Sequence, residues 1–226
     1  MSGQEKEGTS AISHDMNPSR YDLQQIAEKM KSYQPGILGD QLSRTYSVMI
    51  PLIQTEDNKL AVLFEERAHT LRSQAGEICF PGGRWESGDD SFWDTAKRET
   101  SEELQIPLES IEYMGSLDTV FSHAQITIHA YVGRLTDPMA INPNPAEVER
   151  VFSIDLEDLL TMKPARYEVS MKPMLPEDYP LHLIPDGENY KWREAKIPHY
   201  FYQFGEITIW GLTAKILHHF LEIIQK

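Results

Sequence analysis

The sequence predicts an α/β or α+β sandwich, because of the order in which its patterned segments follow one another. A helix-like segment comes first, strand-like segments follow, a second helix and further strands come next, and a third helix ends the pattern. The helix-like segments repeat apolar residues every three to four positions, whereas the strand-like ones alternate or form short β-branched runs. Helices and strands do not alternate one for one, which argues against a regular βαβ array. With 226 residues, 40% of them hydrophobic, the chain can bury one sizeable core.

The N-terminal part of the chain divides into a tail and the start of the fold. Residues 1–16 are small and polar without periodicity, and we expect a disordered tail there. Residues 17–226 are expected to form a single domain, since no linker rich in Gly, Ser or Pro separates two patterned halves. The first helix is expected from an N-cap at Ser19 to about Tyr33, where a Pro-Gly pair follows.

The first strands are expected at 44–54 and 60–66, which are rich in β-branched and large apolar residues. Acidic and amide residues between them supply a turn, so the two strands are expected to pair as a hairpin. A short extended piece at 76–81 leads into a glycine pair. The second helix is expected to begin after Ser91 as N-cap and to end before Pro107.

The second half of the chain continues with strands and one short helix. The strands are expected at 111–120, 125–135 and 148–154, and the short helix at 155–162. An insertion rich in Pro and Tyr is expected around 163–200, with a hairpin turn near Asp186. The last helix is expected over 207–224, where apolar residues recur at amphipathic spacing.

Charge and composition restrict the function classes. The net charge of -14 repels a nucleic-acid backbone and no basic run offsets it, so we expect no nucleic-acid partner. No apolar run approaches the roughly 18 residues of a membrane span, so we expect no membrane partner. The single cysteine, Cys79, excludes an intrachain disulfide and favours a cytoplasmic location. Its place in an apolar strand favours a buried small residue over a nucleophile.

Three carboxylates gather on the second helix. Glu99, Glu102 and Glu103 stand at i, i+3 and i+4, so their side chains share one helical face and repel one another. Two interpretations are open. The acids form a solvated helix face, or they bind cations, and such hard oxygen ligands suit Mg2+ or Mn2+.

The residues around this helix carry a wider pattern. Gly82-Gly83 precede it, and Arg98-Glu99 and Glu102-Glu103 lie within it. Together they resemble the signature of the Nudix hydrolases: Gly, five residues, Glu, seven residues, Arg-Glu, an apolar residue, any residue, Glu-Glu, any residue and Gly.

The signature is matched with departures in the loop and at the helix end. Five residues separate Gly83 from Asp89, which stands where the signature has Glu, and eight residues then lead to Arg98. If the following aspartate is taken as the acid, six residues separate it from Gly83 and seven separate it from Arg98. Thr100 stands where an apolar residue is usual, and Gln105 replaces the later glycine.

A second block lies upstream of the first. It contains Arg67-Ala68, Arg72, Gly76 and Phe80-Pro81-Gly82-Gly83. This is similar to the motif of Nudix coenzyme A pyrophosphatases: Leu-Leu-Thr, any residue, Arg, Ser or Ala, three residues, Arg, three residues, Gly, three residues, Phe-Pro-Gly-Gly. Phe64-Glu65 depart from its Leu-Thr.

The resemblance implies both a fold and an activity. The fold is a Nudix-type α/β/α sandwich with a mixed sheet and the catalytic loop-helix on one side. The activity is metal-dependent hydrolysis of coenzyme A or acyl-coenzyme A to 3′,5′-ADP and a 4′-phosphopantetheine species, so the partner is a small-molecule nucleotide substrate. Two alternatives stay open: a Nudix pyrophosphatase for ADP-ribose or another nucleoside diphosphate derivative, and a non-catalytic Nudix-fold ligand sensor.

The same resemblance implies roles for the acidic residues. Mg2+ or Mn2+ ligands are implied at Gly83, Glu99, Glu102 and Glu103. Glu103 is the expected central ligand, and Glu99 is a ligand that also orients or deprotonates water. Arg98 is expected to pair with Asp89 or Glu102 and to fix the helix against the loop.

Further residues complete the expected site. Glu147 resembles an acid before a late strand of the subfamily and is either a distal catalytic acid or an unrelated residue. Arg67 and Arg72 either contact coenzyme A phosphates or form surface ion pairs. Phe80 and Gly82-Gly83 are expected beside the substrate.

Three regions keep two interpretations each. The insertion around 163–200 either caps the site or builds a dimer contact, so a homodimer is one candidate assembly. His123, between two strands, either serves as an acid or base or has no role. The aromatic run at 200–202 either stacks an adenine or belongs to the core.

Overall fold

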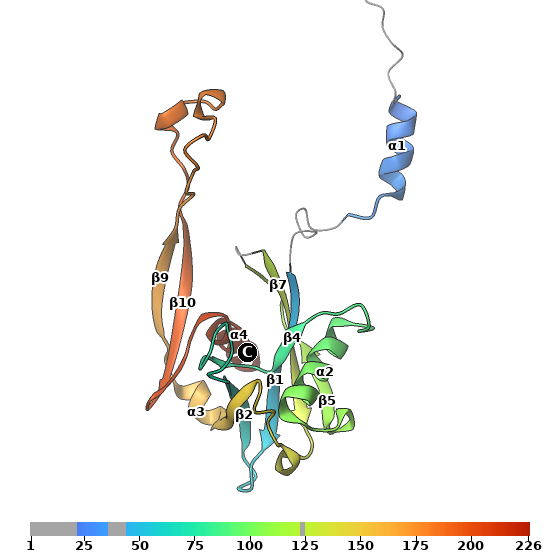
Figure 1. Ribbon diagram of the computed structural model, residues 1–226, viewed down its shortest axis with the longest axis vertical. Helices are drawn as coiled ribbons and strands as arrows, with labels where there is room; N and C mark the ends of the chain where they lie inside the picture. The colour runs from blue at the N-terminus through green and yellow to red at the C-terminus, as the bar shows by residue number, and fades with distance from the viewer. Residues whose placement is uncertain (1–21, 36–43, 123–124) are drawn as a thin grey trace, which may run out of the picture. The chain divides into compact units, whose positions relative to one another are not determined.

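The computed structural model divides the chain into two units, residues 1–41 and 42–226 (Figure 1). It describes residues 22–35, 44–122 and 125–226. The expected tail at 1–16 and the candidate His123 therefore lie outside the described residues.

The first unit contains one described helix, α1, at Leu23–Ser32. Its N-cap is Asp22, whose carboxylate accepts a hydrogen bond from the Gln25 amide at 2.8 Å, while the Gln25 side chain accepts one from the Asp22 amide at 3.4 Å. This capping box fixes the start of the helix. The predicted end near Tyr33 is confirmed, whereas the predicted N-cap, Ser19, lies outside the described residues.

The second unit is built on a mixed sheet with the central order β3-β2-β1-β7-β5. Its strands are β1 (Arg44–Gln54), β2 (Leu60–Arg67), β3 (Ile78–Cys79), β4 (Gly82–Arg84), β5 (Ile111–Ser116), β6 (Val120–Ser122), β7 (Ile126–Leu135) and β8 (Val148–Asp155). β1 runs parallel to β7 and antiparallel to β2 and β4. β8 pairs with β2, and β6 with β7. The hairpin predicted from the first two strands is confirmed.

Helices cover both faces of this sheet. They are α2 (Phe92–Leu104), α3 (Leu156–Thr161) and α4 (Gly211–Ile224), with short 3-10 helices η2 (Leu108–Ser110) and η3 (Pro138–Ala140). Figure 1 shows α2 (green) and α4 (dark red) on opposite sides of β1. Successive side chains of a strand point to opposite faces. Met49 and Ile53 accordingly pack in the cluster that contains α2, and Ile50 and Leu52 in the cluster that contains α4. The predicted α/β/α sandwich is confirmed.

The predicted insertion forms a second, smaller sheet. Its strands are β9 (Ala165–Met171), β10 (Ala195–Phe204) and β11 (Ile207–Ile209), in the order β11-β10-β9. β9 and β10 are the long ribbon drawn in orange in Figure 1. The connection between them, 172–194, contains the 3-10 helices η4 (Leu181–Leu183) and η5 (Gly187–Asn189).

Two predictions in this region are wrong in detail. Asp186 does not form the hairpin turn. It has φ 62° and is the N-cap of η5, because an Asp-Gly pair tolerates the left-handed region without flanking strands. The last helix begins at Gly211 rather than at 207, since residues 207–209 pair with β10. The strand expected at 111–120 is likewise divided into β5 and β6.

Candidate active site

The glycine pair lies directly on β1. Gly82 pairs with Val48 and Gly83 with Ser47 in the β4–β1 ladder. Gly82 has φ +153°, and a Cβ there would stand 2.3 Å from the Ser47 carbonyl oxygen, so only glycine fits. Its amide donates a hydrogen bond to Oε2 of Glu103 at 2.8 Å. The close backbone approach therefore brings a donor to the second helix.

The helix α2 has the ends that the sequence predicts. The Ser91 hydroxyl accepts a hydrogen bond from the Asp94 amide at 3.2 Å, as expected of the N-cap. Gln105 takes the left-handed C-cap position with φ 51°, where the signature has glycine. Thr100, at the usually apolar position, is buried and donates to the Ala96 carbonyl at 2.7 Å. Both departures from the signature are thus accommodated locally.

Arg98 fixes the loop to the helix. Its Nε and Nη2 donate to the two oxygens of Asp89 at 2.9 and 3.1 Å, and Nη2 also donates to the Arg84 carbonyl at 3.3 Å. Asp89, not the following aspartate, is therefore the loop acid in contact with Arg98. This guanidinium holds the pKa of Asp89 well below its usual range. Arg98 Nη1 donates to Glu99 at 2.9 Å and to Glu102 at 3.5 Å.

The three helix acids differ strongly in exposure. Glu103 is 3% exposed, whereas the Glu102 side chain is 57% exposed. Burial, with repulsion from Glu65 as the next cause, raises the pKa of Glu103 well above its usual value, although the Gly82 amide opposes the shift. Burial also raises the pKa of Glu99, with Arg98 opposing it. The helix acids therefore split into two that face the protein and one that faces solvent.

Glu65 on β2 is a site residue that we did not predict. It is 1% exposed, and burial raises its pKa to about 7. Oε1 accepts a hydrogen bond from the Cys79 thiol at 3.2 Å, while Oε2 is buried without a hydrogen-bond partner. The alternation of the strand could have indicated this position. Glu65 lies on the same face of β2 as Ala61 and Leu63, which pack in the cluster that contains α2.

Cys79 itself is half-buried. Burial and the neighbouring Glu65 raise the pKa of its thiol, so the thiol stays protonated. This agrees with the predicted small packed residue rather than a nucleophile.

The predicted distal acid, Glu147, contributes to the electrostatics of this cluster. Its negative charge raises the pKa of Glu65, Glu99 and Glu103. Its Oε1 accepts a hydrogen bond from Asn144 at 3.2 Å. The cluster thus combines acids from α2, from β2 and from the start of β8.

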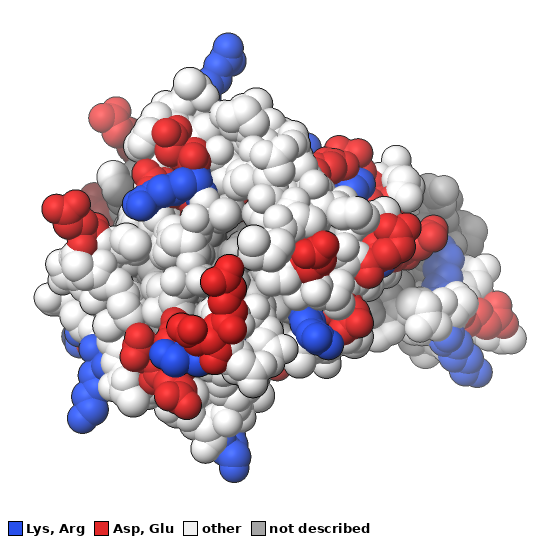
Figure 2. Space-filling model, turned by 90° about the horizontal axis from the view of Figure 1, so that it is seen from below, with Lys and Arg blue, Asp and Glu red and all other residues white. Residues whose placement is uncertain are grey.

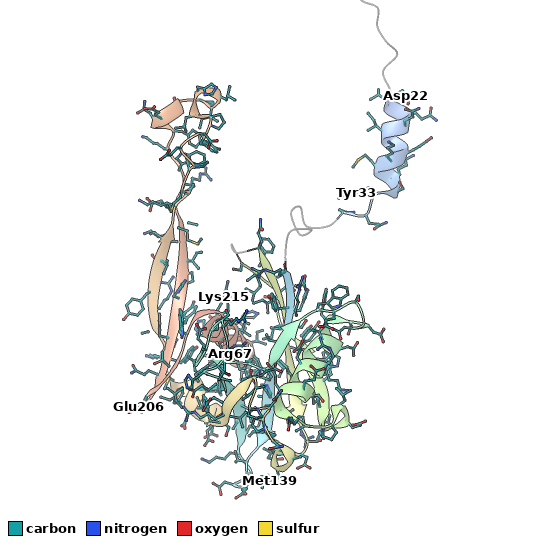
Figure 3. All side chains as sticks on the ribbon, viewed as in Figure 1. Asp22, Tyr33, Arg67, Met139, Glu206 and Lys215 are labelled. Carbon is teal, nitrogen blue, oxygen red and sulfur yellow. The ribbon has the colours of Figure 1, made fainter. Side chains whose placement is uncertain are left out.

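The predicted substrate residues lie in different environments. Arg67, labelled in Figure 3, ends β2, and its buried Nε has no hydrogen-bond partner. Its charge lowers the pKa of Glu65, so the guanidinium lies near the acidic cluster. Arg72 is exposed on the loop after β2. Phe80 requires a correction: it is buried and stacks on Phe64 with ring centroids 5.1 Å apart, so it supports the core instead of facing a substrate.

The aromatic run on β10 also belongs mainly to the core. Tyr202 is buried, and its hydroxyl lies 2.9 Å from Nδ1 of His218. Tyr200 stacks on the same imidazole with centroids 4.0 Å apart. These contacts favour packing over adenine stacking.

The acidic cluster fits a hard divalent cation by the chemistry of its donors. All its donors are oxygens, its carboxylates repel one another, and Glu65 Oε2 is an unpartnered buried acceptor. As the side chains stand, no three His, Cys, Asp or Glu residues within the described ranges converge as metal ligands. Glu99 and Glu102 contact Arg98 instead, and Glu103 accepts a hydrogen bond from the Gly82 amide.

Basic and acidic side chains are interspersed on one face of the molecule. On the face shown in Figure 2, the basic side chains of the described residues lie singly or beside acidic ones and form no continuous basic surface. Among the helices of the described residues, none is long and apolar enough to cross a membrane.

Comparison with known proteins identifies the class. The NUDIX domain family matches residues 43–177, which include the glycine pair, α2 and Glu147. The chain therefore belongs to the Nudix family and is a hydrolase of that family, as predicted.

Two relatives agree with this assignment. The uncharacterized Nudix hydrolase NudL of Photorhabdus laumondii is 31% identical over 81% of this chain and 86% of its own. Nudix hydrolase 3 of Caenorhabditis elegans is 30% identical over 90% of this chain and 83% of its own. Among solved structures, a MutT/nudix family protein from Enterococcus faecalis covers 92% of this chain and 71% of its own, with 14% identity and a TM-score of 0.48.

Proposed function

We propose that this enzyme hydrolyses the pyrophosphate linkage of coenzyme A or acyl-coenzyme A, with Mg2+ or Mn2+ as cofactor. Water adds to one phosphorus, and the bridging oxygen leaves with the other, which gives 3′,5′-ADP and a 4′-phosphopantetheine species. The observation that carries the hydrolytic part is the buried carboxylate cluster beside the glycine pair, with Glu103 at its centre.

The residues of α2 have distinct tasks in this proposal. Glu103, Glu99 and Glu102 hold the cations together with the Gly83 carbonyl, and Glu99 also orients the attacking water. When bound, divalent cations supply charge neutralisation and Lewis-acid activation of water. Arg98 keeps the loop and the helix in register through Asp89 and does not touch the substrate.

The upstream block supports coenzyme A as the substrate. Arg67 lies near the acidic cluster, where a guanidinium can contact the pyrophosphate. Arg72 is exposed on the following loop and is available for the 3′-phosphate of coenzyme A. In a protein with a net charge of -14, such local cations are needed to attract a phosphorylated ligand. The single cysteine fits action in the cytoplasm.

Two alternatives differ from this proposal: an enzyme with another substrate, and a protein that binds a ligand without catalysis. ADP-ribose or another nucleoside diphosphate derivative would use the same acids but would not require the upstream block. A non-catalytic sensor would have no need for the costly burial of Glu103 and Glu65.

The test is a substrate panel with products resolved by chromatography. Purified protein with Mg2+ or Mn2+ is given coenzyme A, acetyl-coenzyme A, ADP-ribose and a dinucleoside polyphosphate. The proposal predicts the highest kcat/KM for coenzyme A or its acyl form, with 3′,5′-ADP as one product. A kcat/KM for coenzyme A no higher than that for ADP-ribose would contradict it.

A further inference from the structure

Glu65 is buried more completely than its contacts justify. Its side chain is 1% exposed, and one of its two oxygens has no hydrogen-bond partner. The other oxygen receives a thiol hydrogen from Cys79, which is a weak donor. Burying a carboxylate with so few partners is costly, and proteins usually compensate such a group with a cation or a metal ion.

Arg67, whose positive charge acts on Glu65, does not complete this compensation. Arg67 lies two residues further along β2 and lowers the pKa of Glu65 through its charge. Its Nε is nevertheless buried without a hydrogen-bond partner, just as Glu65 Oε2 is. The two unpartnered atoms show that Arg67 and Glu65 do not satisfy each other there.

The strand directs Glu65 towards the helix acids. Ala61 and Leu63, which share its face of β2, pack in the cluster that contains Ala96 and Leu104 of α2. Repulsion between Glu65 and Glu103 is consistent with this direction, because each charge disfavours ionisation of the other. A second element thus contributes a carboxylate to the space beside the glycine pair.

We propose that Glu65 is a direct oxygen ligand of a divalent cation at this site, supplied by β2 and additional to the acids of α2. The inference rests on the proposed function, since it assumes that the helix acids bind the cation. The resembled upstream motif has threonine at this position, so this chain adds a negative charge where that motif has a neutral hydroxyl. The cation would occupy the side of Glu65 Oε2 that no protein donor fills.

The competing explanation is a neutral, protonated Glu65 that only packs against Cys79. Glutamine distinguishes the two, because it copies the shape and hydrogen bonding of a neutral carboxyl group but not the charge of a ligand. Exposed Glu149, close by on β8, provides a control with the same change in net charge.

The experiment measures Mn2+ binding to the full chain without substrate, from the electron paramagnetic resonance signal of free Mn2+. We expect Glu65→Gln to weaken binding at least ~10-fold, the lower range for loss of a group that tunes a metal site. Glu149→Gln should stay within about twofold, as expected for a surface change. Glu103→Gln should lose binding as the proposed function requires.

The outcomes separate the role of Glu65 from the proposed function. Wild-type affinity in Glu65→Gln, together with lost binding in Glu103→Gln, would overturn the role of Glu65 and leave the proposed function standing. A wild-type protein that binds no Mn2+ would overturn both.

A second readout separates ligation from folding. In EDTA, Glu65→Gln should melt no lower than the wild type, because a buried charge is removed, and Mn2+ should raise its Tm by less than it raises that of the wild type. If Glu65→Gln does not fold, Glu65→Asp serves the same purpose, since it keeps the charge but withdraws the oxygen by one methylene group. Mn2+ affinity equal to that of the wild type in Glu65→Asp would then contradict direct ligation.

Discussion

The carboxylate of Glu103 accepts a hydrogen bond from the backbone amide of Gly82 at 2.8 Å, across 21 positions of sequence. This contact joins the second helix to the short strand on β1 and holds a nearly fully buried acid in place. A backbone donor cannot be removed by mutation of a side chain, so it is a rigid support for the acid. Changes at the glycine pair or at the acids of α2 should therefore act on the site directly.

Gly83→Ala should lower activity while changing stability little. A Cβ at Gly83 would stand 2.2 Å from the carboxyl carbon of Glu99, so that flexible side chain has to move. A shift of about 1 Å in a catalytic group can cost on the order of 100-fold in rate. Steady-state kinetics and thermal melting measure the two effects. Gly88→Ala in the same loop is the control, because a Cβ there meets nothing within 4 Å, and it should retain wild-type rates.

Asp89→Asn should destabilise the fold by about 2 kcal/mol at neutral pH, the usual scale for hydrogen bonds to charged groups. The Asp89 side chain is 7% exposed and accepts two hydrogen bonds from Arg98, so its loss leaves Nε and Nη2 of a partly buried guanidinium without their carboxylate partner. Urea denaturation measures the difference. The exposed neighbour Asp90 is the control, and Asp90→Asn should change stability by less than about 0.5 kcal/mol.

The effect of Asp89 also has a defined pH dependence. The pKa of Asp89 is lowered in the folded state by Arg98, so its contribution is full above the unfolded pKa of about 3.9 and declines as pH falls through the folded pKa. The stability difference between wild type and Asp89→Asn should therefore be constant from pH 5 to 8 and shrink at strongly acidic pH. A difference that grows on acidification would contradict the pairing.

Glu103→Gln should stabilise the metal-free protein at alkaline pH. The folded pKa of Glu103 is raised by burial, so its favourable contribution is full below the unfolded pKa and is lost as pH rises through the folded pKa. A tenfold difference in proton affinity between the folded and unfolded states is worth about 1.4 kcal/mol. In urea denaturation with EDTA, the free energy of unfolding of Glu103→Gln should therefore be higher than that of the wild type at pH 8 and equal to it near pH 4. Lower stability of Glu103→Gln at pH 8 would argue against a strained, buried charge.

Arg72→Ala should separate coenzyme A from 3′-dephospho-coenzyme A. If Arg72 contacts the 3′-phosphate, its loss should raise the KM for coenzyme A roughly 10-fold, the scale of one charged hydrogen bond, and leave the dephosphorylated substrate unchanged. Arg193→Ala, an exposed arginine in the 172–194 connection, serves as the control. An equal rise of KM for both substrates would assign Arg72 a role other than binding the 3′-phosphate.

Local sequence patterns were sufficient for most of the fold and for the helix acids. The i, i+3, i+4 spacing placed Glu99 and Glu103 on one face, and Ser91 was recognisable as a cap because capping needs only neighbouring residues. Whether Asp89 or the next aspartate is the loop acid of the signature could not be decided, since that depends on the path of the loop.

Long-range relationships were beyond the sequence patterns. Glu65 follows an apolar strand run and is next to another glutamate, a pattern typical of the polar end of a strand. Its partner Cys79 and its neighbour Glu103 lie in other elements, and only tertiary packing brings the three together. The ribbon of β9 and β10 was missed in detail for a similar reason, because its strands pair across the 172–194 connection.

Hydrolysis of coenzyme A by wild type and Glu103→Gln, side by side in Mg2+ with products resolved, tests the central claim most directly. We expect the wild type to release 3′,5′-ADP and 4′-phosphopantetheine. Glu103→Gln, shown to be folded by circular dichroism, should be at least ~100-fold slower, the scale for loss of one group that stabilises developing charge. Undiminished hydrolysis by Glu103→Gln would contradict the account.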